Sequence, residues 1–207
     1  MGRDSENREM QNIRMRIMSI IPVFELGLWN AWILMLYLAL HPFLMGLIDK
    51  DMMKKMGGSD QPNKDDKGPL NSMMLVFLLL IIYSVFLPLK LGTIWFYAGL
   101  PIYLVGMAMF TIAVKNIAST PLGQPFTKGI YCYSRNPMNL ASFLMLIGTG
   151  IATASWFFLV LSAVLIVLIA ALVRTEESYC LERYGKGFRE YMERTPRWIG
   201  MPKSGKN

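Results

Sequence analysis

The residues best equipped for chemistry in this sequence are one arginine and two glutamates that follow a long uncharged stretch. Arg174, Glu176 and Glu177 come directly after residues 136–173, which contain no charged side chain. A guanidinium can hold a carboxylate through two parallel hydrogen bonds. A glutamate whose pKa is raised by burial can take a proton from a reacting group. These three residues are therefore the candidate catalytic residues.

A second polar stretch precedes the uncharged one and reads LGQPFTKGIYCYSRNPMN over residues 122–139. Its glycines and prolines oppose a regular helix, and Pro137 biases Asn136 away from helical dihedral angles. Irregular backbone beside a bilayer is tolerated only where it is buried in protein or lines a cavity. This loop is therefore the first candidate for a binding site.

The composition indicates the elements that must position these residues. The chain is 54% hydrophobic and only 17% charged. Uncharged runs of more than 18 residues recur, and each is long enough to cross a hydrocarbon core of ~30 Å as a helix. The sequence therefore predicts an all-α, polytopic membrane protein. Its first three transmembrane helices are expected at about 26–48, 70–89 and 92–114.

The uncharged stretch 136–173 must hold two further helices. As one helix its 38 residues would measure ~57 Å, nearly twice the thickness of the hydrocarbon core. Small residues and an interfacial Trp gather at 150–156, so the turn of a tight helical hairpin is expected there. About five transmembrane helices result, and the tail after Arg174 is expected to be amphipathic.

The distribution of basic residues predicts the orientation. With five helices, the charged loop 49–69, the segment 115–135 and the C-terminal tail share one face, which carries 16 of the 21 Lys and Arg residues. The positive-inside rule places that face in the cytoplasm. A hairpin returns its two ends to one side, so the polar loop and the residues from Arg174 to Glu177 are expected to line one cytoplasmic pocket.

Several residues have simpler structural explanations. Pro42, next to the only histidine, His41, is expected to kink the first helix or to end its regular part near Leu40. One His and two Cys without metal-ligand spacing predict no metal site. The absence of a basic run interleaved with aromatic residues argues against nucleic-acid binding.

Four glycines are expected to allow close approach of helices: Gly99, Gly106, Gly148 and Gly150.

Residues 122–199 resemble a family of integral-membrane enzymes. The segments FTKGIYCYSRNPMN, RTEE and YGKGFREYMERTPRWI are similar, in order and spacing, to motifs of the methyltransferases typified by isoprenylcysteine carboxyl methyltransferase, which are related to the phospholipid methyltransferases. This resemblance implies an enzyme that uses S-adenosylmethionine in the membrane. Residues 116–207 would form the methyltransferase core, and residues 1–115 the N-terminal tail and first three helices.

The resemblance also implies which residues contact the cofactor. Arg174 would face the acceptor, and Glu176 or Glu177 would be the acidic cofactor contact. The remaining cofactor contacts would come from the polar loop: Gly123, Gln124, Pro125, Phe126, Tyr131, Arg135, Asn136, Pro137, Met138 and Asn139.

Two residues depart from the family pattern, since Asn136 stands in place of a His and Asn139 in place of a Tyr. The first change is typical of bacterial relatives, which implies the cell membrane of a prokaryote. Both changes bear on the acceptor more than on the cofactor. A prenylcysteine-type carboxylate is favoured, because Arg174 could hold it; a phospholipid amine or a small thiol is the alternative, with a glutamate as base.

Two other classes of function remain open at this point. Sterol reductases of membranes carry a similar Arg-x-Pro triplet and use NADPH, although the Glu-Glu pair followed by Tyr-Gly argues against them. A non-catalytic scaffold or a small transporter is the other class, and the lack of internal repeats weakens the transporter. The expected partners are the lipid bilayer and a lipophilic small molecule or prenylated acceptor, and no oligomeric state follows from the sequence.

Overall fold

The computed structural model describes residues 26–56 and 67–202. In these ranges the regular structure is helical, apart from one isolated β-bridge between Asn30 and Pro88. The expected all-α class is therefore confirmed for the described chain. Residues 1–25, 57–66 and 203–207 lie outside it, and with them the N-terminal tail and the middle of the charged loop that the sequence predicted.

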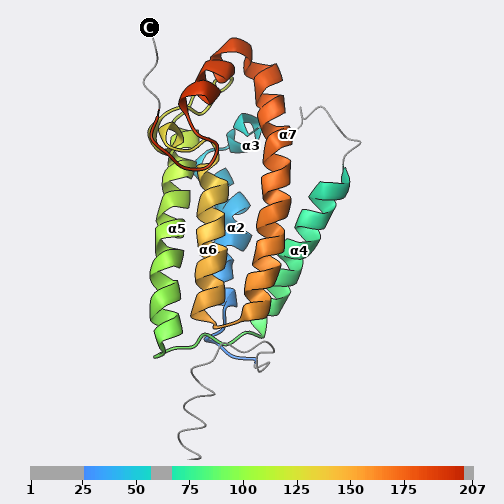
Figure 1. Ribbon diagram of the computed structural model, residues 1–207, viewed down its shortest axis with the longest axis vertical. Helices are drawn as coiled ribbons and strands as arrows, with labels where there is room; N and C mark the ends of the chain where they lie inside the picture. The colour runs from blue at the N-terminus through green and yellow to red at the C-terminus, as the bar shows by residue number, and fades with distance from the viewer. Residues whose placement is uncertain (1–25, 57–66, 203–207) are drawn as a thin grey trace, which may run out of the picture.

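Apolar helices run up and down beside one another and form a bundle (Figure 1). They are α2 (Trp32–Ile48), α4 (Lys67–Val85), α5 (Ile94–Ala118), α6 (Pro137–Ala152) and α7 (Trp156–Arg194). Helices α4, α5 and α7 are long and apolar enough to cross a membrane, whereas α2 and α6 are shorter apolar helices. A short helix, α3 (Met52–Lys55), and a 3-10 turn, η2 (Gly129–Cys132), lie at one end of the bundle.

Of the two outcomes expected at Pro42, the end of the helix near Leu40 is not observed, because α2 continues through this residue to Ile48. Proline has no N–H to donate to the carbonyl four residues earlier, which here is that of Leu38. The His41 ring nitrogen Nδ1 bonds this carbonyl instead. The histidine therefore replaces the lost hydrogen bond, and its ring also packs edge-on against Phe110.

The predicted hairpin is confirmed. Helix α6 ends at Ala152 and α7 begins at Trp156, so the turn falls inside the expected range 150–156. Ser155 caps α7 by accepting a hydrogen bond from the Phe158 N–H at 3.2 Å. The Ser155 hydroxyl also lies 3.2 Å from the Tyr83 hydroxyl, which ties the turn to α4.

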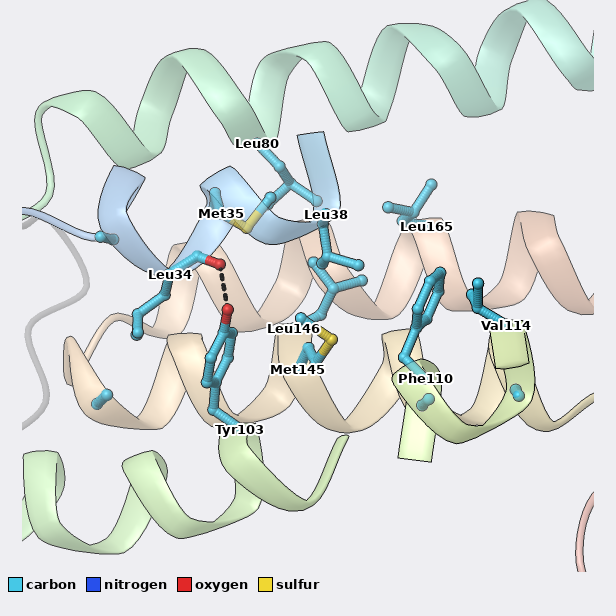
Figure 2. Close-up of a cluster of buried hydrophobic side chains, with 14 of the residues drawn as sticks. Leu34, Met35, Leu38, Leu80, Tyr103, Phe110, Val114, Met145, Leu146 and Leu165 are labelled. Atoms are coloured by element: carbon cyan, nitrogen blue, oxygen red, sulfur yellow. Dashed lines mark hydrogen bonds between the residues drawn. The ribbon is translucent and has the colours of Figure 1, made fainter. Parts of the chain in front are cut away.

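The hydrophobic core lies where α2, α5, α6 and α7 meet, with Leu80 added from α4 (Figure 2). The Tyr103 hydroxyl is buried within it and donates a hydrogen bond of 2.7 Å to the Leu34 carbonyl. This bond satisfies a phenol that would otherwise be costly to bury. The core side chains labelled in the view are Leu34, Met35, Leu38, Leu80, Tyr103, Phe110, Val114, Met145, Leu146 and Leu165.

Helix α7 extends well past the uncharged stretch and then bends. The tail expected after Arg174 is a direct continuation of α7, which runs to Arg194 and has non-helical dihedral angles only at Gly185, with φ 57° and ψ −128°. Such dihedral angles are accessible to glycine and strained for other residues. Beyond the bend the chain arches back over the loop between α5 and α6 (Figure 1). This return places the C-terminal residues beside the polar loop.

Candidate functional site

The polar loop between α5 and α6 packs against the C-terminal end of α5. Gly129 has φ 64°, and a Cβ there would collide with the side-chain amide of Asn116. The 3-10 turn that follows buries the Tyr131 side chain, and burial raises the pKa of its phenol, with a smaller contribution from Tyr191. From α7, the Tyr191 hydroxyl donates a hydrogen bond of 2.7 Å to the Tyr131 carbonyl. The turn is therefore clamped between two helices.

The loop ends at the start of α6. Pro137 is the first helical residue, where its fixed φ suits a helix and its missing N–H costs nothing. Asn136 precedes it with non-helical dihedral angles, and its backbone N–H donates to the Ser134 hydroxyl at 3.1 Å. The Asn136 side chain makes no capping hydrogen bond to α6.

Glu177 of α7 is the centre of a buried polar cluster at this end of the bundle. Its side chain is only 7% exposed. Its Oε2 accepts two hydrogen bonds from Arg197, at 3.0 Å from Nε and 2.8 Å from Nη2. Its Oε1 accepts one from Asn136 Nδ2 at 3.2 Å, and Arg135 Nε lies 3.4 Å from the same oxygen. The cluster joins residues more than forty positions apart in the sequence.

The segment Thr195–Gly200, called the strap below, covers the last residues of the loop. Arg135 N–H donates to the Pro196 carbonyl at 3.0 Å, and Gly200 N–H donates to the Tyr133 carbonyl at 3.0 Å. The ring of Trp198 packs on that of Phe143 from α6, with centroids 5.5 Å apart. The strap thus reaches both the loop and the first helix of the hairpin.

Two buried donors near the loop have no hydrogen-bond partner among the described residues. They are Arg135 Nε and Asn116 Nδ2. Buried donors are usually satisfied, so each of these atoms is a position where a ligand could accept a hydrogen bond. The cluster also places two guanidinium groups against one carboxylate, which favours an anionic group on such a ligand.

An open cavity of about 460 Å³ lies beside the loop and the bent end of α7. Its lining residues are Thr127, Cys132, Gly187, Glu190, Tyr191, Arg194, Thr195 and Pro202. None of the residues predicted to contact a cofactor is among them, so the cavity borders the predicted site without coinciding with it.

The structure brings together only part of the predicted set. Arg135, Asn136 and Glu177 meet directly, and the ring of Phe126 lies 5.8 Å from that of Tyr131. The other loop residues flank them: Gly123 and Gln124 are exposed, Pro137 is buried, and Pro125, Met138 and Asn139 are half-buried.

The other two candidate catalytic residues lie apart from this cluster. Arg174 and Glu176 are exposed on α7, and their side chains make no ion pair with the described residues. Arg174 is one helical turn before Glu177, on the side toward the uncharged part of the helix.

Sequence reasoning missed Arg197 and Asn116. The residue Arg197 falls within a motif that carried the family resemblance, yet nothing in its spacing connects it to Glu177. A usable signal was the glutamate itself, because a carboxylate expected to be buried needs a cation to compensate it. Asn116 has no such signal, since its importance arises from its contact with Gly129.

Comparison with known proteins identifies the segment that holds most of this site. Residues 94–187 match the family model of the phospholipid methyltransferases. The matched region comprises α5, the polar loop, α6 and α7 as far as Gly187, and so includes Glu177 but not the strap. No curated protein gives a significant match to the chain. Within the segment 94–187 the chain is therefore similar to the phospholipid methyltransferases, a group related to the isoprenylcysteine carboxyl methyltransferase-like membrane enzymes.

Proposed function

We propose that this chain is an S-adenosylmethionine-dependent methyltransferase that acts on a lipid-like acceptor from within the membrane. One observation carries the proposal: the hydrogen bond between Asn136, at the end of the polar loop, and Glu177, on the last helix of the hairpin. This bond joins the two regions of the sequence that resemble the cofactor motifs of the family. It does so within the segment that matches the methyltransferase model.

The residues present suit the chemical groups of this cofactor. S-adenosylmethionine offers a carboxylate, an ammonium group, a sulfonium and ribose hydroxyls. The unpartnered donors Arg135 Nε and Asn116 Nδ2 suit its carboxylate. The carboxylate of Glu177 has room for about four hydrogen bonds and accepts three, so one acceptor position of Oε1 remains for a hydroxyl or a cationic group.

The bound cofactor would supply a methyl group made electrophilic by the positive sulfonium. Transfer of that group requires alignment and exclusion of water more than acid–base catalysis. The packed loop is suited to this task, since Tyr131 is buried and η2 is clamped between α5 and α7. Met138 and Asn139, in the first turn of α6, would lie along the path between cofactor and acceptor.

The acceptor depends on the exposed residues of α7. Arg174 is available to hold a carboxylate, as in a prenylcysteine-type acceptor. The match to phospholipid methyltransferases favours a second candidate, a phospholipid amine. That acceptor must lose a proton before it can attack, and Glu176 would be the base.

The proposed arrangement places the site on the cytoplasmic face of five membrane helices. Residues 116–207 would form the catalytic core, and the helices before them would support it. The alternation of helix directions in Figure 1 supports this layout, because α3, the polar loop and the strap share one end of the bundle. The excess of Lys and Arg in the same regions of the sequence supports its cytoplasmic location.

Calorimetry on detergent-purified protein tests the proposal. We expect saturable binding of S-adenosylmethionine and none of NADPH. Glu177→Ala should weaken binding by ~1.5–3 kcal/mol, the value of a hydrogen bond to a charged group. Glu176→Ala, at the exposed neighbouring position, is the matched variant. Its affinity for S-adenosylmethionine should fall only if both carboxylates contact the cofactor. Binding of NADPH in place of S-adenosylmethionine, or of neither, would reject the proposed function.

A further inference from the structure

We propose that Arg197 is a positioning residue for the methyltransferase site and that the strap is a functional part of that site. The inference rests on the proposed function, because Glu177 is the group through which Arg197 would act. It also extends beyond the family match, which ends at residue 187, ten residues before Arg197. The assignment therefore depends on the contacts of this chain alone.

The burial of Glu177 requires a strong partner. A buried carboxylate without compensation loses most of its hydration energy, and it becomes protonated or destabilises the fold. Arg197 supplies the two shortest of the hydrogen bonds to this side chain, at 2.8 and 3.0 Å. Arg135 is near but offers no hydrogen bond from its Nε. Arg197 is thus the group that holds the Glu177 carboxylate in a fixed orientation.

The two oxygens of Glu177 have different roles. Oε2 is bound by Arg197 from the outer side, where the guanidinium is 37% exposed. Oε1 faces the loop, where it meets Asn136 and Arg135. Because Arg197 holds one oxygen, the carboxylate cannot rotate freely, and Oε1 with its remaining acceptor position stays directed toward the predicted cofactor contacts.

Asn136 is oriented by the same residue. Its Nδ2 donates to Glu177 Oε1 at 3.2 Å and to the Arg197 carbonyl at 3.3 Å. Both partners are acceptors only, so the amide nitrogen must face them and the amide oxygen must face away. The backbone of Arg197 therefore fixes which polar atom Asn136 presents beyond the cluster. This gives Asn136 a defined orientation at the position where the family pattern has a histidine.

The strap is well enough anchored for this task. Besides the two backbone hydrogen bonds with Arg135 and Tyr133, the Ser134 hydroxyl donates to the Arg197 carbonyl at 3.4 Å. Trp198 adds an apolar contact with Phe143. Contacts on both sides of Arg197 hold its backbone in place, so its side chain approaches Glu177 from a fixed point.

A double-mutant cycle on the full chain tests the inference. Affinity for S-adenosylmethionine is measured by calorimetry for Arg197→Gln, Glu177→Gln and the double variant. We expect Arg197→Gln to weaken binding by roughly tenfold or more, since a hydrogen-bonded charge pair is lost. Arg197→Lys should recover part of the affinity, because one ammonium can replace one of two donors. In the Glu177→Gln background, Arg197→Gln should have little further effect.

Control variants distinguish a positioning role of Arg197 from a loss of folding and from failure of the proposed function. Arg189→Gln removes an exposed arginine of α7, the helix that carries Glu177, and should leave affinity unchanged. The double variant removes both charges of the Arg197–Glu177 pair together and so leaves no uncompensated Glu177 carboxylate, which provides a second measurement if Arg197→Gln alone does not fold. Wild-type affinity in Arg197→Gln, or an equal loss in both backgrounds, would overturn the role of Arg197. A wild-type protein that binds no S-adenosylmethionine would instead overturn the proposed function.

Discussion

Gly148 of α6 lies directly against the backbone of Gly99 of α5. A Cβ on Gly148 would be 2.8 Å from the Gly99 carbonyl oxygen and 2.6 Å from the Tyr103 nitrogen, closer than side-chain carbons approach backbone atoms. Gly106 makes a similar approach, 2.8 Å from the Ala141 carbonyl oxygen. The sequence prediction that these glycines allow close helix approach is confirmed. The contact matters for function because α5 and α6 carry the two ends of the polar loop.

Gly148→Ala should therefore destabilise the protein by about 1–3 kcal/mol, the usual cost of forcing extra volume into a packed interior. The backbones must separate, since no flexible side chain can yield. Gly46→Ala is the matched control, because a Cβ at Gly46 of α2 meets nothing within 4 Å. Unfolding in detergent, followed by circular dichroism, measures both. Equal stability of the two variants would show that the α5–α6 contact is looser than described.

The position of the end of α5 depends on a lysine from the preceding half of the chain. Lys55 Nζ donates to the Ala118 carbonyl at 2.8 Å and pairs with Asp49 Oδ2 at 2.7 Å. The hydrogen bond from Lys55 holds the pKa of the Asp49 carboxyl below its ordinary value of 3.8, with a smaller effect from the Asp51 N–H. A lowered pKa stabilises the folded state above that value, and this contribution is lost as the pH falls through the lowered pKa.

Lys55→Met should therefore lower the melting temperature more at neutral pH than well below pH 3.8, where Asp49 is protonated. Lys54→Met, at a neighbouring side chain that is 72% exposed, should have little effect at either pH. Melting curves of the purified protein at both pH values provide the measurement. A loss for Lys55→Met that does not change with pH would mean that its bond to Ala118 alone stabilises the fold.

Gly185 determines whether the strap reaches the site. Its dihedral angles are strained for any residue with a Cβ, although a Cβ there would meet no atom within 4 Å. Gly185→Ala should cost about 1 kcal/mol or more through the backbone alone. Gly187→Ala, two residues later with no positive φ and equally open space, should be neutral or stabilising.

The two glycine variants should also differ in how the strap is protected. Straightening of α7 at Gly185 would draw Arg197 away from Glu177, so hydrogen exchange of the strap amides should rise in Gly185→Ala and stay at the wild-type level in Gly187→Ala. Both variants are measured by mass spectrometry on the detergent-solubilised protein. Identical exchange in the two would show that the bend is not needed to hold the strap.

Much of this architecture follows from the sequence because length alone forces it. Residues 136–173 are too long for one membrane crossing, so the hairpin and its turn could be predicted within a few residues. The loop was found because proline and glycine cannot continue a helix. The contact of Arg197 with Glu177 was not predicted, because it depends on the bend of α7 at Gly185. No local sequence pattern indicates that bend. The sequence left open whether α2 would end at Pro42, because the bond from the His41 side chain to the Leu38 carbonyl could not be predicted from it.

The layout of the bundle predicts which positions share a side of the membrane. Single cysteines at Gly123 and Lys186, both exposed, should react with a membrane-impermeant thiol reagent from the same side. A cysteine at Leu91, which is 47% exposed at the opposite end, should react only from the other side. Ser155 is unsuitable for this purpose, since its side chain is buried. Native Cys132 and Cys180 are first replaced by serine, and labelling of Leu91 from the side of Gly123 would contradict the layout.

Arg174 allows the acceptor chemistry to be distinguished. It lies one turn before Glu177 on α7, at the end of the uncharged stretch, where a lipid acceptor would present its polar group. A guanidinium can grip a carboxylate with two parallel hydrogen bonds, and an ammonium cannot reproduce that grip. If the acceptor is a prenylcysteine-type carboxylate, Arg174→Lys should reduce methyl transfer by about 2–3 kcal/mol of transition-state stabilisation, or roughly a hundredfold in rate.

Affinity for S-adenosylmethionine should meanwhile change little, because the Arg174 side chain makes no ion pair with the buried Glu177 cluster. The test measures radiolabelled methyl transfer to a prenylcysteine analogue and, separately, to phosphatidylethanolamine in mixed micelles. A guanidinium would repel a protonated amine, so Arg174 would not assist methyl transfer to an amine acceptor. Near-normal turnover of the lysine variant on the phospholipid would therefore reject the carboxylate acceptor. In that case Glu176→Gln should abolish the rate, because the exposed glutamate would be the base that deprotonates the amine.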